Sequence, residues 1–302
     1  MNRMPNFLIV GAAKSGTTAL YHYLSQHPEI FLSPIKETNF FAQKGKKVDY
    51  KGPKDNISGH KSTITEISDY QNQFSAVNNE KAVGEICPSY LYSEDASRNI
   101  KEHIPEVKII VILREPVARA FSAWVHLTRD DREYLTFKEA LLEEESRINN
   151  NWAEIWHYLA KSRYYNQLKR YYDLFSKEQI KVFIYEKFKD NPIKVYSEIC
   201  DFIGVDNSFL PDMRSKHNKG GIPKNKIIWN LMMKNNIWKT IFNNIVPMKI
   251  RKKVKQVIES RNVKKKPELD NNTRKELSVQ FLNEIRRIEE LIEQDLTAWK
   301  LK

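Results

Sequence analysis

The sequence predicts an α/β fold, a doubly wound parallel sheet flanked by helices, with a helical C-terminal extension. Short apolar runs rich in Val, Ile and Leu alternate with amphipathic segments, which is the pattern of parallel strands joined by crossover helices. The run at 107–113 is almost entirely apolar, as expected of a strand buried on both faces. The 302 residues can bury a large core. We expect one domain, with its core at about 1–226 and a basic helical extension at about 227–302.

Each predicted element has a local signal. Gly11 ends the first apolar run, Pro116 suits the first turn of a helix because no N–H is needed there, and Gly204 is placed to end a helix. The expected strands, in chain order, are 7–10, 82–86, 107–113 and 180–185. The expected helical segments are 17–26, the one that begins at Pro116, 136–148, 193–203 and 273–296, with an aromatic-rich stretch at 153–175.

The charge is unevenly distributed. The formal net charge is +12, and residues 214–302 hold 22 Lys and Arg against nine Asp and Glu, whereas the first 213 residues are nearly balanced. This asymmetry favours a polyanionic ligand or an anionic membrane surface, although a solvated basic helix needs no partner. No recognition motif accompanies the basic residues, so nucleic acid is not expected. The apolar and basic segment 227–250 could be an acceptor lid, a peripheral membrane contact or packing on the domain.

Several classes of protein are not expected. No stretch approaches the roughly 18 apolar residues of a membrane-spanning helix, and residues 1–10 lack the features of a signal peptide. Cys87 and Cys200 are the two cysteines, far apart in sequence, and the seven histidines show no zinc-ligand spacing, so we expect no metal. A reducing, cytoplasmic setting fits best, with a possible peripheral contact to the membrane.

The segment GAAKSGTT at 11–18 carries the strongest local signal. A strand, a loop with two glycines and a helix start let backbone N–H groups approach a phosphate, and the helix N-terminus adds about half a positive charge. The pattern is P-loop-like, but a nucleoside-triphosphate loop has its lysine directly after the last glycine, whereas Lys14 precedes Gly16 by two positions. The segment therefore predicts an anion-binding loop, and a kinase becomes the weaker alternative.

A second motif follows the buried strand at 107–113. Arg114 is followed by Pro116 and, eight residues after the arginine, by Ser122. Together the two motifs resemble those of the sulfotransferases that use 3′-phosphoadenosine 5′-phosphosulfate (PAPS), most closely the heparan-sulfate-type and bacterial branch. The resemblance implies that Arg114 and Ser122 hold the 3′-phosphate of PAPS. It implies that the 5′-phosphosulfate is held by Lys14, Ser15, Gly16, Thr17 and Thr18.

The same resemblance implies a catalytic centre. Glu85 matches the glutamate of the family's Glu-Lys-Ser/Thr-Pro context and is expected to deprotonate the acceptor hydroxyl, while Lys14 neutralises charge on the departing nucleotide. The family's lysine after that glutamate is Ile86 here, so one cation is missing. Lys36 and Glu37 resemble the family's Glu-x-x-Phe-Phe segment; Lys36 could compensate, and Glu37 could bind the acceptor or hold the loop.

A late basic loop completes the expected donor site. Lys219, Gly220 and Gly221 resemble the family's loop that folds over the nucleotide. The expected function is transfer of a sulfuryl group to the hydroxyl of a carbohydrate or of a lipid or sterol alcohol. The alternatives are a nucleotide kinase of the P-loop type and a non-catalytic module that binds an adenosine bisphosphate.

Overall fold

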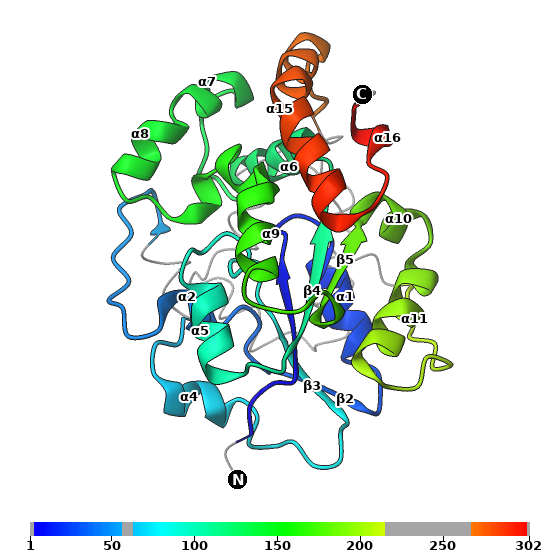
Figure 1. The fold of residues 1–302 in the computed structure, drawn as a ribbon. Helices are drawn as coiled ribbons and strands as arrows, with labels where there is room; N and C mark the ends of the chain where they lie inside the picture. The colour runs from blue at the N-terminus through cyan, green and yellow to red at the C-terminus, as the bar shows by residue number, and fades with distance from the viewer. Residues whose placement is uncertain (1–2, 56–62, 215–266, 301–302) are drawn as a thin grey trace, which may run out of the picture. The chain divides into compact units, whose positions relative to one another are not determined.

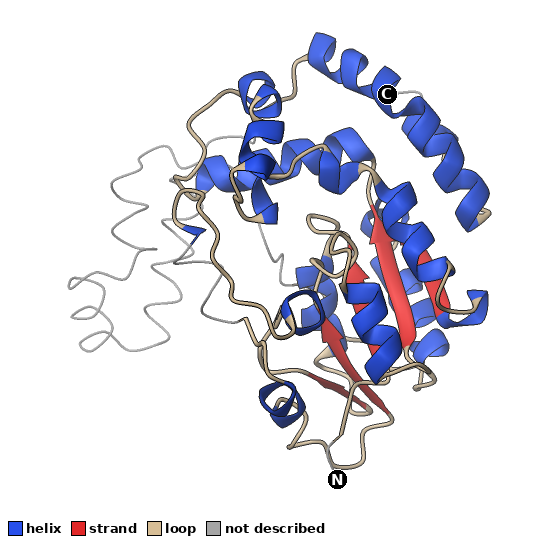
Figure 2. Cartoon of the chain, turned by 60° about the vertical axis from the view of Figure 1, so that its left-hand side comes forward, coloured by secondary structure: helices blue, strands red, loops and turns tan. Residues whose placement is uncertain are grey.

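The structure, a computed structural model, describes residues 3–55, 63–214 and 267–300. A five-stranded sheet in the order β2-β3-β1-β4-β5 forms its centre, and every strand pairing is parallel (Figure 1). The strands are β1 (Phe7–Gly11), β2 (Ile30–Leu32), β3 (Ala82–Ile86), β4 (Lys108–Leu113) and β5 (Ile180–Ile184). Because β1 lies inside the sheet and helices flank it (Figure 2), the predicted doubly wound parallel fold is confirmed.

The helices follow the prediction in some places and depart from it in others. Pro116 and Gly204 bound their helices as expected, and Gly204 takes the left-handed conformation, with φ 82°. The helices are α1 (Thr17–Leu24), α2 (Phe40–Gln43), α4 (Ile67–Asn72), α5 (Ala96–His103), α6 (Pro116–Arg129), α7 (Phe137–Leu142), α8 (Glu144–Asn149), α9 (Tyr164–Tyr172), α10 (Tyr185–Asp190), α11 (Pro192–Ile203), α15 (Asn271–Ile292) and α16 (Thr297–Lys300).

Two predicted helical stretches are interrupted. The segment 136–148 forms two short helices, α7 and α8, separated at Glu143. Glu144 begins α8 and turns inward, where its carboxylate accepts the backbone N–H groups of Leu159 and Ala160, both at 2.7 Å. The aromatic-rich stretch 153–175 is short 3₁₀ turns until α9 begins at Tyr164. The apolar periodicity could not reveal an inward-facing carboxylate that binds a loop 15 residues away.

The two faces of the sheet bury different side chains. Successive residues of a strand point to opposite faces, so Ala82 and Ile86 of β3 pack into the apolar cluster that α1, α10 and α11 cover. Glu85 therefore points to the other face, where Tyr70 of α4 reaches it. A carboxylate is thus buried on one face of a strand whose other four residues are apolar or glycine.

The chain divides into two compact units. The first comprises residues 1–124, 135–217 and 270–302, and the second comprises 125–134 and 218–269. Of the second unit the structure describes 125–134 and 267–269. Helix α15, expected to belong to a C-terminal extension, is part of the first unit and contacts α9: Glu284 accepts the N–H of Tyr165 at 2.7 Å, and the guanidinium of Arg287 lies 3.6 Å from the centre of the Tyr165 ring. The single domain stays a prediction. No helix in the described ranges is long and apolar enough to cross a membrane.

Candidate functional site

The residues expected to bind the donor follow strands whose carboxyl ends meet at one edge of the sheet. Lys14 follows β1 and Arg114 follows β4, and these two strands are paired neighbours. Ligands of open α/β sheets bind outside this edge. The guanidinium Nη1 of Arg114 donates to the backbone oxygen of Lys14 at 3.0 Å, so the fold joins two motifs that lie 100 residues apart in sequence.

The loop after β1 is tightly wound. Lys14 and Gly16 have φ angles of 72° and 88°, in the left-handed region, and Gly16 is the N-cap of α1. A β-carbon at Gly16 would lie 2.9 Å from the ring of Phe188, so only glycine fits. The hydroxyl Oγ of Ser15 is buried without a hydrogen-bond partner in the described part of the chain. A buried donor at the start of a helix suits a phosphate or sulfate oxygen.

The guanidinium of Arg114 packs against an aromatic ring. The guanidinium lies 4.8 Å from the centre of the Tyr185 ring, and its Nε is buried without a partner among the residues described. Ser122 lies half-buried on α6, six residues or about 1.7 helical turns beyond Pro116. The structure gives no hydrogen bond between Ser122 and Arg114 within the described ranges. Arg114 therefore keeps donor capacity for a ligand, and Ser122 stays a predicted second contact.

Sequence reasoning did not single out the residues that hold the Arg114 turn. Glu115 is buried, and its carboxylate accepts the N–H groups of Val117 and Ala118 at 2.9 and 2.8 Å. It therefore caps the N-terminus of α6 from the position before Pro116. The backbone N–H of Glu115 donates to Glu186 at 3.2 Å. Arg119 is also buried and donates to Ser162 at 2.7 Å. In the sequence, Glu115 and Arg119 are an acidic and a basic residue on either side of Pro116 at the start of a helix. Composition alone does not show that their side chains point inward.

Glu85 is buried and fully hydrogen-bonded. Its Oε1 accepts the backbone N–H and the hydroxyl of Thr38 at 3.0 and 2.6 Å, and its Oε2 accepts the hydroxyls of Tyr70 and Tyr90, both at 2.9 Å. The residue is 1% exposed. Burial raises the pKa of Glu85, and the hydrogen bonds from Thr38 and the two tyrosines oppose that rise. In this arrangement the carboxylate has four donors and no free approach for an acceptor hydroxyl.

Glu37 presents a second carboxylate in the loop after β2. Its side chain is 45% exposed and paired with Lys36 of the same loop. Its backbone φ is 63°, again left-handed, and its neighbour Thr38 is the residue that Glu85 binds. The structure thus joins Glu37 and Glu85 through Thr38, with Glu37 exposed and Glu85 buried.

Two groups of predicted residues lie outside the described ranges. Lys219, Gly220 and Gly221 do so, and so does the whole of 227–250, with its predicted roles as lid, membrane contact or packing. These assignments stay predictions.

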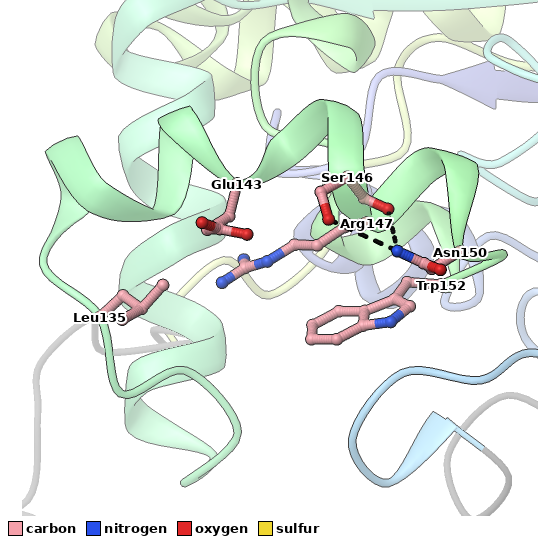
Figure 3. Close-up of a pocket in the computed structure, with 6 residues that line it drawn as sticks. All are labelled: Leu135, Glu143, Ser146, Arg147, Asn150 and Trp152. Atoms are coloured by element: carbon pink, nitrogen blue, oxygen red, sulfur yellow. Dashed lines mark hydrogen bonds between the residues drawn. The ribbon is translucent and has the colours of Figure 1, made fainter.

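The described part of the chain also contains a pocket that no sequence motif predicted. It has a volume of about 280 Å³ and is formed around α8 (Figure 3). Asn150 closes one side by donating to the backbone oxygen and hydroxyl of Ser146 at 2.8 and 3.4 Å. The lining residues are Leu135, Glu143, Ser146, Arg147, Asn150 and Trp152. None of the predicted donor-site residues lines it, so it is separate from the candidate site.

Comparisons with known proteins agree with the fold and identify a family. The model of the sulfotransferase family matches residues 5–209. A crystal structure of a sulfotransferase from Alicyclobacillus acidocaldarius has 34% sequence identity and a TM-score of 0.78, with 99% of each chain covered. The membrane-associated sulfotransferase kil1 of Dictyostelium discoideum is 23% identical over 282 residues, covering 68% of this chain and 57% of its own length. Human bifunctional heparan sulfate N-deacetylase/N-sulfotransferase 3 is 28% identical over 211 residues, which cover 68% of this chain and 23% of the human protein. The chain thus spans about half, or a quarter, of these curated relatives.

Proposed function

The chain belongs to the sulfotransferase family, and from this premise we propose that it transfers the sulfuryl group of PAPS to an acceptor hydroxyl. The hydrogen bond from Arg114 to the backbone of Lys14 carries the proposal, because it brings the two phosphate-type motifs into one site. The unpartnered Ser15 hydroxyl and the glycine-only position at Gly16 fit a phosphosulfate group in the loop.

Each residue of the site has a proposed task. Bound PAPS would supply an activated sulfuryl group with adenosine 3′,5′-bisphosphate as the leaving group. The loop 14–18 would bind the 5′-phosphosulfate, and Arg114 with Ser122 would bind the 3′-phosphate, because a guanidinium can bind two oxygens of a phosphate at once. Lys14 would stabilise the negative charge that develops on the leaving group. Lys219, Gly220 and Gly221 would add contacts to the nucleotide.

The acceptor proton needs a base, and the two glutamates differ in access. Glu85 was the expected base, but its four donors and its burial favour Glu37, whose carboxylate is partly exposed. We therefore propose Glu37 as the base and Lys36 as the cation that compensates for Ile86. A proton-abstracting carboxylate contributes roughly 10²–10⁴-fold to the rate. Glu37→Gln should lower kcat by this order while leaving the donor dissociation constant unchanged.

The acceptor is proposed to be a carbohydrate hydroxyl. The relatives named as heparan sulfate N-deacetylase/N-sulfotransferases support a carbohydrate, although their names specify a nitrogen acceptor; the hydroxyl is the expectation from the sequence. A lipid or sterol alcohol is the second candidate, because segment 227–250 is rich in apolar residues and the basic run 251–253 follows it directly. The position of Lys14 disfavours a nucleotide kinase. Measured sulfuryl transfer would distinguish an enzyme from a silent nucleotide-binding module.

Donor use is tested with radiolabelled PAPS and separate glycan and sterol acceptor panels. Adenosine 3′,5′-bisphosphate should raise the melting temperature by mass action, and AMP, which lacks the 3′-phosphate, should raise it much less. Equal stabilisation by both nucleotides would remove Arg114 and Ser122 from the donor site. Stabilisation by the bisphosphate without transfer to any acceptor would favour the non-catalytic module.

A further inference from the structure

The buried carboxylate of Glu85 is hydrogen-bonded to the loop that follows β2. Two of its four hydrogen bonds come from one residue, Thr38, through both the backbone N–H and the hydroxyl. The other two come from Tyr70 and Tyr90, which are themselves fully buried. Hydrogen bonds to an ionised group are stronger than neutral ones. Glu85 therefore fixes Thr38 relative to β3.

The loop that Glu85 holds is strained on both sides of Thr38. Glu37 and Asn39 have φ angles of 63° and 57°, a conformation that side chains other than glycine rarely adopt. Such residues persist where surrounding contacts hold them in place, and they concentrate at functional sites. Asn39 has its own anchors, since its Nδ2 donates to the backbone oxygen of Glu37 at 3.1 Å and its Oδ1 accepts from Ser89 at 2.6 Å.

The anchors on Thr38 and Asn39 leave Glu37 little freedom. β3 supplies Glu85, and the turn that follows it supplies Ser89. Both bind the loop after β2, which places Glu37 next to two fixed residues. The aromatic neighbours stiffen the arrangement, because the Tyr70 ring stacks on Phe40 at 4.4 Å with an interplanar angle of 14°.

We propose that Glu85 is a positioning residue: through Thr38 it holds the strained loop 36–39 so that the Glu37 carboxylate faces the acceptor. This rests on the proposed function, in which Glu37 is the base. It assigns Glu85 a task different from proton transfer. A loop that loses this anchor relaxes from its left-handed conformation, and the Glu37 carboxylate moves from its catalytic position.

Thr38→Val and Thr38→Ser separate positioning from simple stability. Valine keeps the shape of threonine but removes the hydroxyl that Glu85 accepts, whereas serine keeps it. Thr38→Val should speed amide hydrogen exchange in residues 36–40 by about tenfold or more, because a hydrogen bond to a charged group is lost. It should also lower kcat by roughly 10–100-fold, the cost of a misplaced catalytic group. Thr38→Ser should behave like the wild type in both measurements.

Tyr70→Phe provides the matched control. It removes one donor to the same carboxylate and keeps the stacking on Phe40, but the lost bond is to Oε2, whereas Thr38 donates to Oε1. Its exchange in residues 36–40 should stay within about twofold of the wild type.

The pH profile identifies the base. If Glu85 positions Glu37 rather than accepting the proton, Thr38→Val and Glu85→Gln should lower kcat but keep the acidic limb of the pH–rate profile. Glu37→Gln should abolish that limb. The proposal is overturned if Glu85→Gln removes the limb, or if Thr38→Val exchanges and turns over like the wild type. Hydrogen exchange needs no substrate, so accelerated exchange without any detectable sulfuryl transfer would confirm the anchor and reject the proposed function alone.

Discussion

Gly16 holds the most crowded position of the loop after β1. Its φ of 88° and the 2.9 Å approach of the Phe188 ring act together, because a β-carbon there would be both strained and obstructed. Gly45 shares the left-handed conformation, with φ 65°, but among the described residues no atom beyond its two chain neighbours lies within 4 Å of a β-carbon built on it. A side chain at Gly16 would therefore meet both backbone strain and steric conflict, whereas a side chain at Gly45 would meet backbone strain alone.

Gly16→Ala should destabilise the protein more than Gly45→Ala. Both variants pay roughly 1–2 kcal/mol for a left-handed alanine, and Gly16→Ala adds about 1–3 kcal/mol for overpacking against Phe188. Urea unfolding measures the two free energies, and the bisphosphate thermal shift measures the donor site. We expect the shift to disappear in Gly16→Ala and to persist in Gly45→Ala. Equal costs for the two variants would show that Phe188 moves away without penalty.

His157 makes stability depend on pH. Burial, with Lys161 nearby, lowers the pKa of His157 from 6.5 to about 4, and its ring bonds Tyr92 through Nδ1 and the Trp152 carbonyl through Nε2. As the pH falls, the unfolded chain takes up the proton before the folded chain does. The contribution of His157 to the free energy of unfolding is therefore full above about pH 6.5 and is lost towards pH 4.

The size of this effect can be measured between pH 7 and pH 5. The free energy of unfolding should fall by about 2 kcal/mol from His157 alone over this interval. His157→Gln removes the titrating group, so urea unfolding of this variant should show a pH dependence flatter by about that amount. Parallel curves for the variant and the wild type would show that His157 keeps an ordinary pKa.

At the residue scale, the sequence predicts types of group better than their access. Lys14 and Arg114 could be found because each follows a strand and belongs to a local motif, and the fold brings them together as expected. Glu85 was placed correctly on its strand, but its donors Thr38, Tyr70 and Tyr90 lie 47, 15 and 5 residues away. Burial of a carboxylate depends on such distant partners, so no local pattern could distinguish an open base from a buried anchor.

At the scale of elements, apolar runs predict the longer strands, but a very short strand has no periodic pattern and is not predicted. The predicted run 82–86 coincides with β3, and β4 and β5 begin or end within one residue of their predicted bounds. β2 has three residues, too few for a periodic signal, and it was missed. The missed strand leads into the loop that carries Lys36 and Glu37, which explains why their position at the edge of the sheet could not be predicted.

Helix α15 shows which face of an element contributes to stability. Phe281 is 1% exposed and packs beneath the guanidinium of Arg163, whereas Val279, two residues earlier, is 67% exposed. Phe281→Ala should cost about 3–5 kcal/mol through the cavity that it leaves. Val279→Ala, a matched truncation on the same helix, should change the free energy of unfolding by less than about 0.5 kcal/mol. Similar values for both variants in urea unfolding would mean that α15 does not pack on α9 as described.

At the scale of the whole molecule, chain order and packing disagree. The sequence suggested a core ending near residue 226, because a loop rich in Gly, Lys and Asn at 216–226 precedes the apolar and basic segment. The compact unit that contains the sheet instead takes in residues 270–302 and leaves 218–269 to the other unit. A loop signal is local in the sequence, whereas the buried face of a unit depends on contacts between distant segments, so the loop could not place this boundary.

The packing of the last 33 residues predicts that they cannot be removed without damage to the donor site. Trp299 donates to Glu186 at 3.2 Å, Glu186 accepts the N–H of Glu115, and Arg274 lies 3.6 Å from the Glu115 carboxylate. Glu115 is the neighbour of Arg114. A chain that ends at residue 269 loses these contacts and exposes the surface of α9 that α15 covers. Its melting temperature should therefore fall, and the stabilisation by adenosine 3′,5′-bisphosphate should weaken. A truncated chain that melts and binds like the full one would show that residues 270–302 are an extension outside the core, as expected from the sequence.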